Sequence, residues 1–211
     1  MKSPLRDIKI EKTTNGIPFV VIDNFFKNSE KKQILHELEF IRPHLNGPGT
    51  TGGAENPDGS TKKYNNSLWC HDFFAAPQIS AIYNLTRQYY EPDLLSQISA
   101  GFWPAQYFNI FPNFVRQNIQ VLYYEQNNNY DTHVDKAFVT CLYWTHKTPK
   151  KFEGGDIILD GETNVKCKDN RLLIFPSITK HKVTPVNMIN KGNGYGRYCI
   201  SNFIHLHTID Q

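Results

Sequence analysis

The sequence lacks the features of disulfide-stabilised or membrane-spanning proteins. Four of its 211 residues are cysteines, and no two are spaced as Cys-x-x-Cys. This favours four reduced thiols over a disulfide scaffold or a structural zinc site. No apolar run approaches the ~20 residues that a membrane span requires, and the first residues have no apolar segment typical of a secretory signal. We therefore expect a cytoplasmic protein with no membrane partner.

The sequence also lacks a strong charge of either sign. Its 23 basic and 20 acidic residues give a net charge of +3, which is too small and too dispersed to indicate a nucleic-acid partner. Aromatic residues are abundant, with 14 Phe, 11 Tyr and 3 Trp, and this excludes a disordered chain. The length fits one domain, 1–211.

The first half of the chain carries the helix signals. A short apolar run at 17–22 predicts a strand, and apolar spacing after Asn28 and again after Pro77 predicts two helices. Between them, residues 46–60 are dense in Gly, Pro, Asn and Asp. A loop this long is usually either a lid or disordered, so we consider both for residues 46–63.

The second half of the chain has the pattern of an antiparallel β protein. Short apolar segments are separated by Gly, Asn, Pro and Lys clusters, and no long helix interrupts them. They predict strands at 119–125, 137–145, 156–159, 171–175, 182–186 and 197–204. We therefore expect a mainly β fold, with support helices and a lid loop in 1–117 and a double sheet in 118–204.

Three residues in this half could hold a metal ion. His133 and Asp135 are two residues apart, so an extended backbone points both to the same face. His181, at the start of a predicted strand, is the natural third ligand. Two His and one carboxylate form the facial triad of non-haem Fe(II) oxygenases. His-x-Asp alone is a weak pattern, so this prediction depends on what surrounds it.

Two further features fit such a site. Gly154 and Gly155 precede a predicted strand and allow a tight turn or a close backbone approach. Arg197 begins the last long strand. An Arg inside a barrel is costly unless it meets an anion, and a dicarboxylate bound to the metal at its other end would supply one.

The ordered set of His133-x-Asp135, Gly154-Gly155-Asp156, His181 and Arg197 resembles the 2-oxoglutarate/Fe(II)-dependent dioxygenases, and more narrowly their prolyl 4-hydroxylase-like branch. The resemblance covers about residues 118–204. It implies a double-stranded β-helix, or jelly roll, and this agrees with the strand pattern.

The resemblance also implies roles for individual residues. His133, Asp135 and His181 match the iron ligands. Arg197 matches the basic residue that binds the distal carboxylate of 2-oxoglutarate, with Lys191 as an alternative because the spacing from His181 is longer than usual. Tyr124 matches a tyrosine that hydrogen-bonds 2-oxoglutarate. Tyr130 matches an aromatic residue near the substrate, whereas Phe203 stands where the branch often has a tryptophan.

The implied function is hydroxylation of an unactivated C–H bond, of peptidyl proline in the first place. The implied cofactors are Fe(II), 2-oxoglutarate as co-substrate, and O₂, with ascorbate as a further candidate. Two alternatives remain open: a hydroxylase of a free amino acid or small metabolite, and a non-catalytic jelly-roll metal-binding module. The partner is then a peptide, a protein or a small molecule, and the chain is a monomer or a homodimer.

Overall fold

The computed structural model describes residues 6–99, 116–189 and 192–205. Its β elements are β1 (Asp7–Lys12), β2 (Pro18–Asp23), β3 (Asn66–Trp69), β4 (Arg116–Tyr124), β5 (Tyr130–His133), β6 (Val139–Thr145), β7 (Phe152–Gly154), β8 (Ile157–Leu159), β9 (Thr163–Val165), β10 (Arg171–Pro176), β11 (His181–Val183), β12 (Val186–Met188) and β13 (Arg197–His205). Its helices are α1 (Asn28–Ile41), α2 (Cys70–Phe73), α3 (Ala81–Thr86) and α4 (Pro92–Ser99), with 3-10 turns η1 (Arg42–His44), η2 (Pro77–Ile79) and η3 (Arg87–Tyr90).

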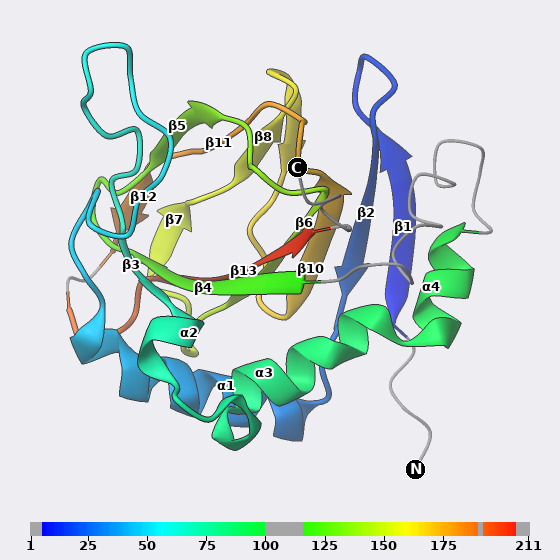
Figure 1. Cartoon of the computed structure of the whole chain (residues 1–211), viewed down its shortest axis with the longest axis horizontal. Helices are drawn as coiled ribbons and strands as arrows, with labels where there is room; N and C mark the ends of the chain where they lie inside the picture. Colours follow the sequence, from blue (N-terminus) through cyan, green and yellow to red (C-terminus); the bar gives the residue numbers. More distant parts are fainter. Residues whose placement is uncertain (1–5, 100–115, 190–191, 206–211) are drawn as a thin grey trace, which may run out of the picture.

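The described strands form an antiparallel jelly roll. The larger sheet has the order β1-β2-β10-β6-β13-β4-β3, and the smaller one has the order β5-β11-β8-β9. Strands β12 and β7 form a separate pair. Helices α1, α2 and α3 lie below the larger sheet, α4 lies at its right-hand side near β1, and the smaller sheet lies above it (Figure 1). This confirms the mainly β double-sheet fold.

Alternation along the strands separates two apolar clusters. In β2, Val20 and Ile22 face the helices, whereas Phe19 and Val21 face the space between the sheets. Strand β6 is buried on both faces, as expected for the middle of a three-layer arrangement. The inter-sheet layer is therefore where side chains from both sheets can meet.

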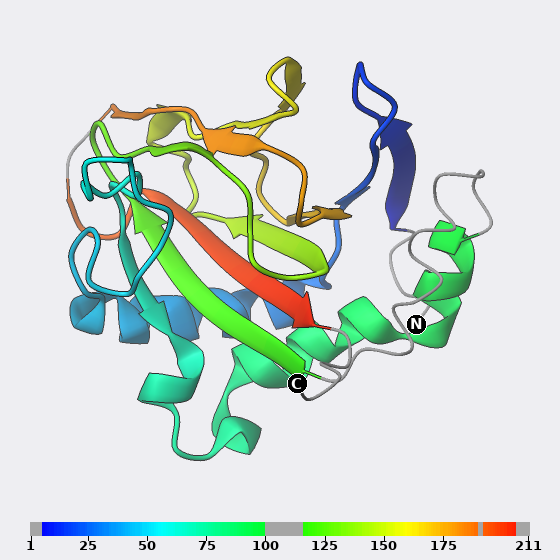
Figure 2. The same cartoon turned by 45° about the horizontal axis from the view of Figure 1, so that its top comes forward.

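The first half of the chain contains more β structure than we predicted. The strand expected at 17–22 is β2, but β1 and β3 were missed, and both extend the larger sheet. The helix expected from Pro77 is broken into η2, α3 and η3. Helix α1 is capped through Lys27, whose backbone N–H donates to Glu30. Figure 2 shows loop 46–63 beside β3 at one end of the sheets.

No helix among the described residues is both long enough and apolar enough to cross a membrane.

Candidate functional site

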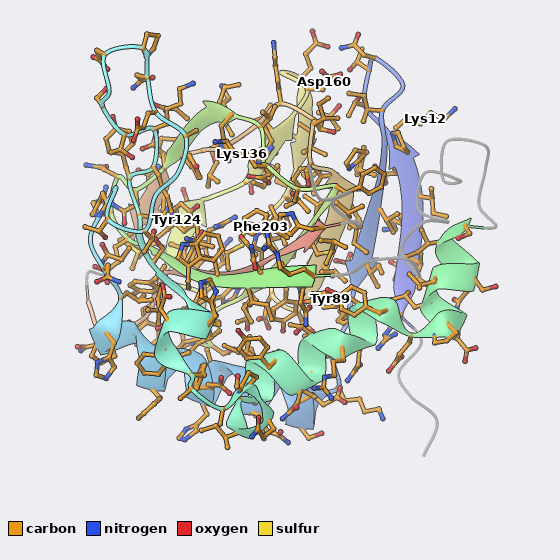
Figure 3. The ribbon with its side chains drawn as sticks, viewed as in Figure 1. Lys12, Tyr89, Tyr124, Lys136, Asp160 and Phe203 are labelled. Carbon is orange, nitrogen blue, oxygen red and sulfur yellow. The ribbon has the colours of Figure 1, made fainter. Side chains whose placement is uncertain are left out.

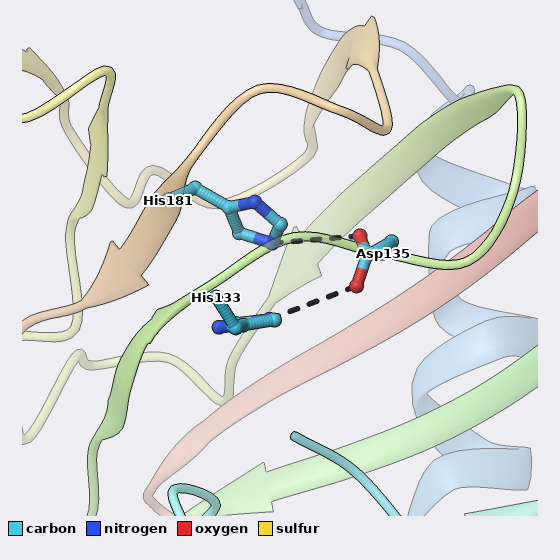
Figure 4. A group of neighbouring side chains, drawn as sticks. All are labelled: His133, Asp135 and His181. Carbon is cyan, nitrogen blue, oxygen red and sulfur yellow. Dashed lines mark ion pairs between the residues drawn. The ribbon is translucent and has the colours of Figure 1, made fainter. Parts of the chain in front are cut away.

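The three predicted metal ligands meet between the sheets. His133 ends β5, Asp135 follows two residues later, and His181 begins β11, where it pairs directly with His133. One ligand atom from each lies within 4.8 Å of the others. Asp135 is 3.6 Å from Nε2 of His133 and 3.4 Å from Nε2 of His181 (Figure 4). The structure therefore brings together all three residues that the sequence singled out.

Backbone carbonyls orient both imidazoles. Nδ1 of His133 lies 2.7 Å from the carbonyl of Asp131, and Nδ1 of His181 lies 2.9 Å from the carbonyl of Thr179. A carbonyl only accepts, so each Nδ1 carries the proton and each Nε2 keeps its lone pair towards Asp135. Burial, together with the neighbouring His181, lowers the pKa of His133 to about 3. Neutral imidazoles of fixed tautomer beside a carboxylate are the donor set that a divalent metal requires.

Two hydroxyl residues that the sequence analysis missed hold Asp135. The Thr140 hydroxyl donates to Oδ2 of Asp135 at 2.7 Å, and it lies 2.8 Å from the Ser177 hydroxyl. The backbone N–H of Asp135 donates to the carbonyl of Ser177 at 3.0 Å. The only signal for Thr140 was a hydroxyl residue in a strand whose other inward residues, Leu142 and Trp144, are apolar.

The triad lines a cavity of about 1000 Å³. Its floor is a ladder of paired residues from β13 and β4. The pairs are Arg197 with Tyr124, Cys199 with Leu122, Ser201 with Gln120, Phe203 with Asn118, and His205 with Arg116. Alternation places all of these side chains on one face. The predicted common face of Arg197, Cys199 and Ser201 is thus confirmed.

Arg197 lies at one end of this ladder without a counter-ion. Its side chain is completely buried, and none of its three guanidinium nitrogens has a hydrogen-bond partner among the described residues. The guanidinium carbon lies 4.6 Å from the ring centroid of Tyr124 and 5.5 Å from that of Trp144. A buried, unpaired guanidinium is costly, and an anionic ligand would remove that cost. Lys191, the alternative, lies outside the described residues.

The two predicted tyrosines occupy different parts of the cavity. Tyr124 lies beside Arg197, and burial raises its pKa well above the usual range. Tyr130 stacks on His133, with ring centroids 3.6 Å apart, and burial raises its pKa to about 12. Both hydroxyls are therefore protonated at neutral pH.

Loop 46–63 forms one wall of the cavity. Thr51, Gly52, Gly53 and Ala54 line it, and the N–H of Ala54 donates to the Tyr130 hydroxyl at 2.9 Å. Trp69 of β3 donates to the carbonyl of Thr51 at 2.9 Å. The loop is thus in the place of a lid, and its opening stays a prediction.

Two more cavity residues escaped the sequence analysis. Lys63 is the last residue of the loop and is 1% exposed. Its ammonium donates to the Thr51 hydroxyl at 2.9 Å, and burial lowers its pKa to about 8. Gln120 is 3% exposed, and its Nε2 has no partner among the described residues. Neither stands in a motif, so only the fold could reveal them.

The inward-facing His-Asp-His cluster has the donor set of the facial triad found in non-haem Fe(II) oxygenases. Residues 119–205 match the family model of the 2OG-Fe(II) oxygenase superfamily, so the β core of this chain is similar to that of 2OG-Fe(II) oxygenases. Enzymes of this superfamily use Fe(II), 2-oxoglutarate and O₂.

Curated relatives match a short part of the chain. A PKHD-type hydroxylase of Gloeothece citriformis is 32% identical over 74 residues, which is 30% of this chain and 34% of the relative. A PKHD-type hydroxylase of Aliarcobacter butzleri is 34% identical over 80 residues, with the same coverage. The match thus spans about a third of the length of these relatives.

Solved structures extend the likeness in fold to most of the chain. A prolyl-4-hydroxylase of Pseudomonas putida has a TM-score of 0.62 and 16% identity, with 90% of this chain and 93% of that one covered. A prolyl 4-hydroxylase of Phytophthora capsici has a TM-score of 0.56 and 17% identity, covering 90% and 59%. The arrangement of helices and sheets is therefore similar to that of these two prolyl 4-hydroxylases.

Proposed function

We propose that this protein is a 2-oxoglutarate/Fe(II)-dependent dioxygenase that hydroxylates an unactivated C–H bond, with peptidyl proline as the first substrate to test. The observation that carries the proposal is the pairing of a buried His-Asp-His cluster with an unpartnered Arg197 in one cavity. A metal at the cluster and a carboxylate at Arg197 would satisfy both. The PKHD-type hydroxylases and the prolyl 4-hydroxylase structures support the same chemistry.

The residues present fit the implied cofactors. His133, Asp135 and His181 would hold Fe(II) through two neutral nitrogens and one carboxylate. Arg197 would bind the distal carboxylate of 2-oxoglutarate, and the protonated hydroxyl of Tyr124 would supply a hydrogen bond beside it. When bound, iron and 2-oxoglutarate supply oxidative decarboxylation to succinate and CO₂, coupled to hydroxylation of the substrate.

The protein's own contribution is positioning and exclusion of water. The ring of Tyr130 covers one face of His133. The Tyr130 hydroxyl accepts a hydrogen bond from the N–H of Ala54 and so holds loop 46–63 against the cavity. The loop then closes one wall around the substrate carbon. A shielded pocket keeps the reactive centre from solvent, which is the protein's main task in such enzymes.

The test is succinate formation from 2-oxoglutarate with Fe(II) and ascorbate, with and without peptidyl-proline substrates. We expect slow uncoupled turnover alone and faster turnover with a substrate. Faster turnover with free amino acids but not with peptides would favour the small-metabolite alternative. No turnover, together with no Fe(II) or Mn(II) binding, would leave only a non-catalytic jelly-roll module without a metal.

The remaining partner assignments are also proposals. We propose a cytoplasmic monomer or homodimer without a nucleic-acid partner. Cell fractionation and light scattering after size-exclusion chromatography test these assignments directly.

A further inference from the structure

The cavity has a charge imbalance that the whole chain lacks. The chain holds 23 basic and 20 acidic residues, yet among the described residues the cavity is lined by six Lys or Arg and one carboxylate, Asp135. The six cations are Lys62, Lys63, Arg116, Lys136, Lys180 and Arg197. At the ratio of basic to acidic residues in the whole chain, a cavity with six cations would also contain about five carboxylates.

The proposed cofactors account for only one of these cations. A divalent metal and Asp135 together carry a charge of +1, and Arg197 raises it to +2. The two carboxylates of 2-oxoglutarate balance that charge. The other five cations then have no counter-charge from the cofactors, so the cavity is suited to a further anion.

Of these five cations, Lys63 is the one whose side chain is buried. Lys62, Arg116, Lys136 and Lys180 lie at its more exposed margins, where solvent weakens their charges. Lys63 is buried, and among the described residues its ammonium donates one hydrogen bond, to the Thr51 hydroxyl. Asp135, the carboxylate that acts on its charge, is one of the proposed metal ligands. An ammonium is costly to bury without further anionic partners, so the position is suited to a charged ligand group.

The floor near Lys63 offers a second unused donor. Thr51 also lies 2.6 Å from the hydroxyl of Ser67. In β3, Ser67 pairs with Leu122, and Trp69 pairs with Gln120. Lys63 is thus connected through Thr51 to the strand next to Gln120, whose buried Nε2 has no partner among the described residues. Unsatisfied buried donors are rare and require an explanation.

The cavity also extends well beyond the 2-oxoglutarate end. From Tyr124 to Arg116 the floor runs along eight residues of β4, roughly 27 Å at ~3.4 Å per residue. Tyr124 and Phe203 mark separate points along this floor, and Lys136 lies on the opposite side (Figure 3). There is therefore room for a ligand in addition to 2-oxoglutarate.

From the cation excess, buried Lys63 and the unpaired amide of Gln120, we infer that the primary substrate bears a carboxylate, which Lys63 and Gln120 bind. The inference rests on the proposed function and specifies its substrate class. The carboxylate belongs either to acidic side chains flanking a peptidyl target or to a free small acid. Lys63 is then a specificity residue, and the marginal cations attract the substrate to the cavity.

Matched probes of equal shape test this inference. Acetyl-Glu-Pro-Glu-amide is compared with acetyl-Gln-Pro-Gln-amide, and N-acetylproline with N-acetylprolinamide. Binding to the Mn(II) protein loaded with N-oxalylglycine, an inert analogue of 2-oxoglutarate, is measured by titration calorimetry. We expect at least one acidic probe to bind about tenfold or more tightly than its neutral partner. The pair that shows the preference identifies the source of the carboxylate.

Variants tie the preference to Lys63. The preference should disappear in Lys63→Met, recover in Lys63→Arg and persist in Lys32→Ala, which removes an equal charge on α1 outside the cavity. Equal binding of acidic and neutral probes, no binding of either acidic probe, or a preference unchanged in Lys63→Met would overturn the inference. Binding of Mn(II) and N-oxalylglycine is measured first, so failure of the proposed function is distinguished from failure of the substrate class.

Discussion

Arg197 and Tyr124 face each other across paired strands β13 and β4, with the guanidinium carbon 4.6 Å above the tyrosine ring. This stacking holds the guanidinium in place, and none of its nitrogens is hydrogen-bonded to a described residue, so they can bind a ligand. Arg197→Met should therefore weaken 2-oxoglutarate binding about 100-fold, because a buried charge pair is lost. Calorimetric titration of the Mn(II) protein measures it. Arg197→Lys should recover part of the affinity. Unchanged affinity in Arg197→Met would show that 2-oxoglutarate does not bind at Arg197.

Gly155 determines where the Arg197 side chain can lie. A Cβ at Gly155 would come within 2.5 Å of Cδ of Arg197, and the residue has a φ of +71°. Gly155→Ala should thus lower both stability and 2-oxoglutarate affinity, the latter about tenfold. Gly161→Ala is the matched control, since its φ is +84° but no atom lies within 4 Å of the added Cβ. It should lose stability without losing affinity, and an equal loss of affinity in both variants would contradict this role.

The metal ligands can be tested without any substrate. His133→Ala, Asp135→Ala and His181→Ala should each weaken Mn(II) or Fe(II) binding more than about 100-fold, a larger loss than that expected for residues behind the ligands. Calorimetry or electron paramagnetic resonance of Mn(II) provides the measurement. His71→Ala removes an exposed imidazole outside the cavity and should bind metal as the parent does. If His133→Ala bound metal with the affinity of the parent, the assignment of His133 as a metal ligand would be wrong.

Thr140 is predicted to act through Asp135. Thr140→Val removes the hydroxyl that donates to Oδ2 of Asp135 but keeps the shape of the side chain. We expect a metal affinity 10- to 100-fold lower, as is typical for residues that orient a ligand. Thr140→Ser keeps the hydroxyl and should restore most of the affinity. A purely structural role would instead lower the melting temperature of both variants and leave metal affinity unchanged.

The sequence was most informative where function imposes a residue type at a fixed spacing. His133, Asp135, His181 and Arg197 could be picked out because their chemistry is unusual at inward strand positions. Alternation correctly predicted the common face of Arg197, Cys199 and Ser201. It did not by itself bring the triad together, because Asp135 lies two residues beyond the end of β5 and His181 comes from β11. The roles of Arg197, Tyr124 and Tyr130 stay predictions, as do the metal-ligand roles.

The missed features depend on contacts between distant segments. Strand β3 consists of four residues after a Gly-rich loop, and it is held by pairing with β4, fifty residues later. Lys63 looks like a surface residue in sequence because a charged side chain is seldom buried. Its burial follows from an isolated bridge to Tyr130, which no local pattern encodes. The break between η2 and α3 likewise depends on Glu37 of α1, which accepts hydrogen bonds from Ser80 and Ala81.

An ion pair away from the cavity should make stability depend on pH. Asp23 of β2 accepts two hydrogen bonds from Arg171 of β10, at 2.6 and 2.7 Å. These bonds lower the pKa of Asp23 below its usual 3.8. Because the folded-state pKa is the lower one, the stabilisation is fully present above pH 3.8 and disappears as the pH falls through the folded-state value.

Asp23→Asn should therefore destabilise the protein by about 2 kcal/mol at pH 7. This value lies between those typical of exposed and of buried ion pairs, because the carboxylate is partly exposed. Urea unfolding of parent and variant between pH 7 and pH 3 measures the difference in the free energy of unfolding. That difference should shrink below pH 3.8, where Asp23 of the unfolded parent is protonated and the parent loses its advantage. A difference of the same size across the whole range would show that the variant loses packing and not an ion pair.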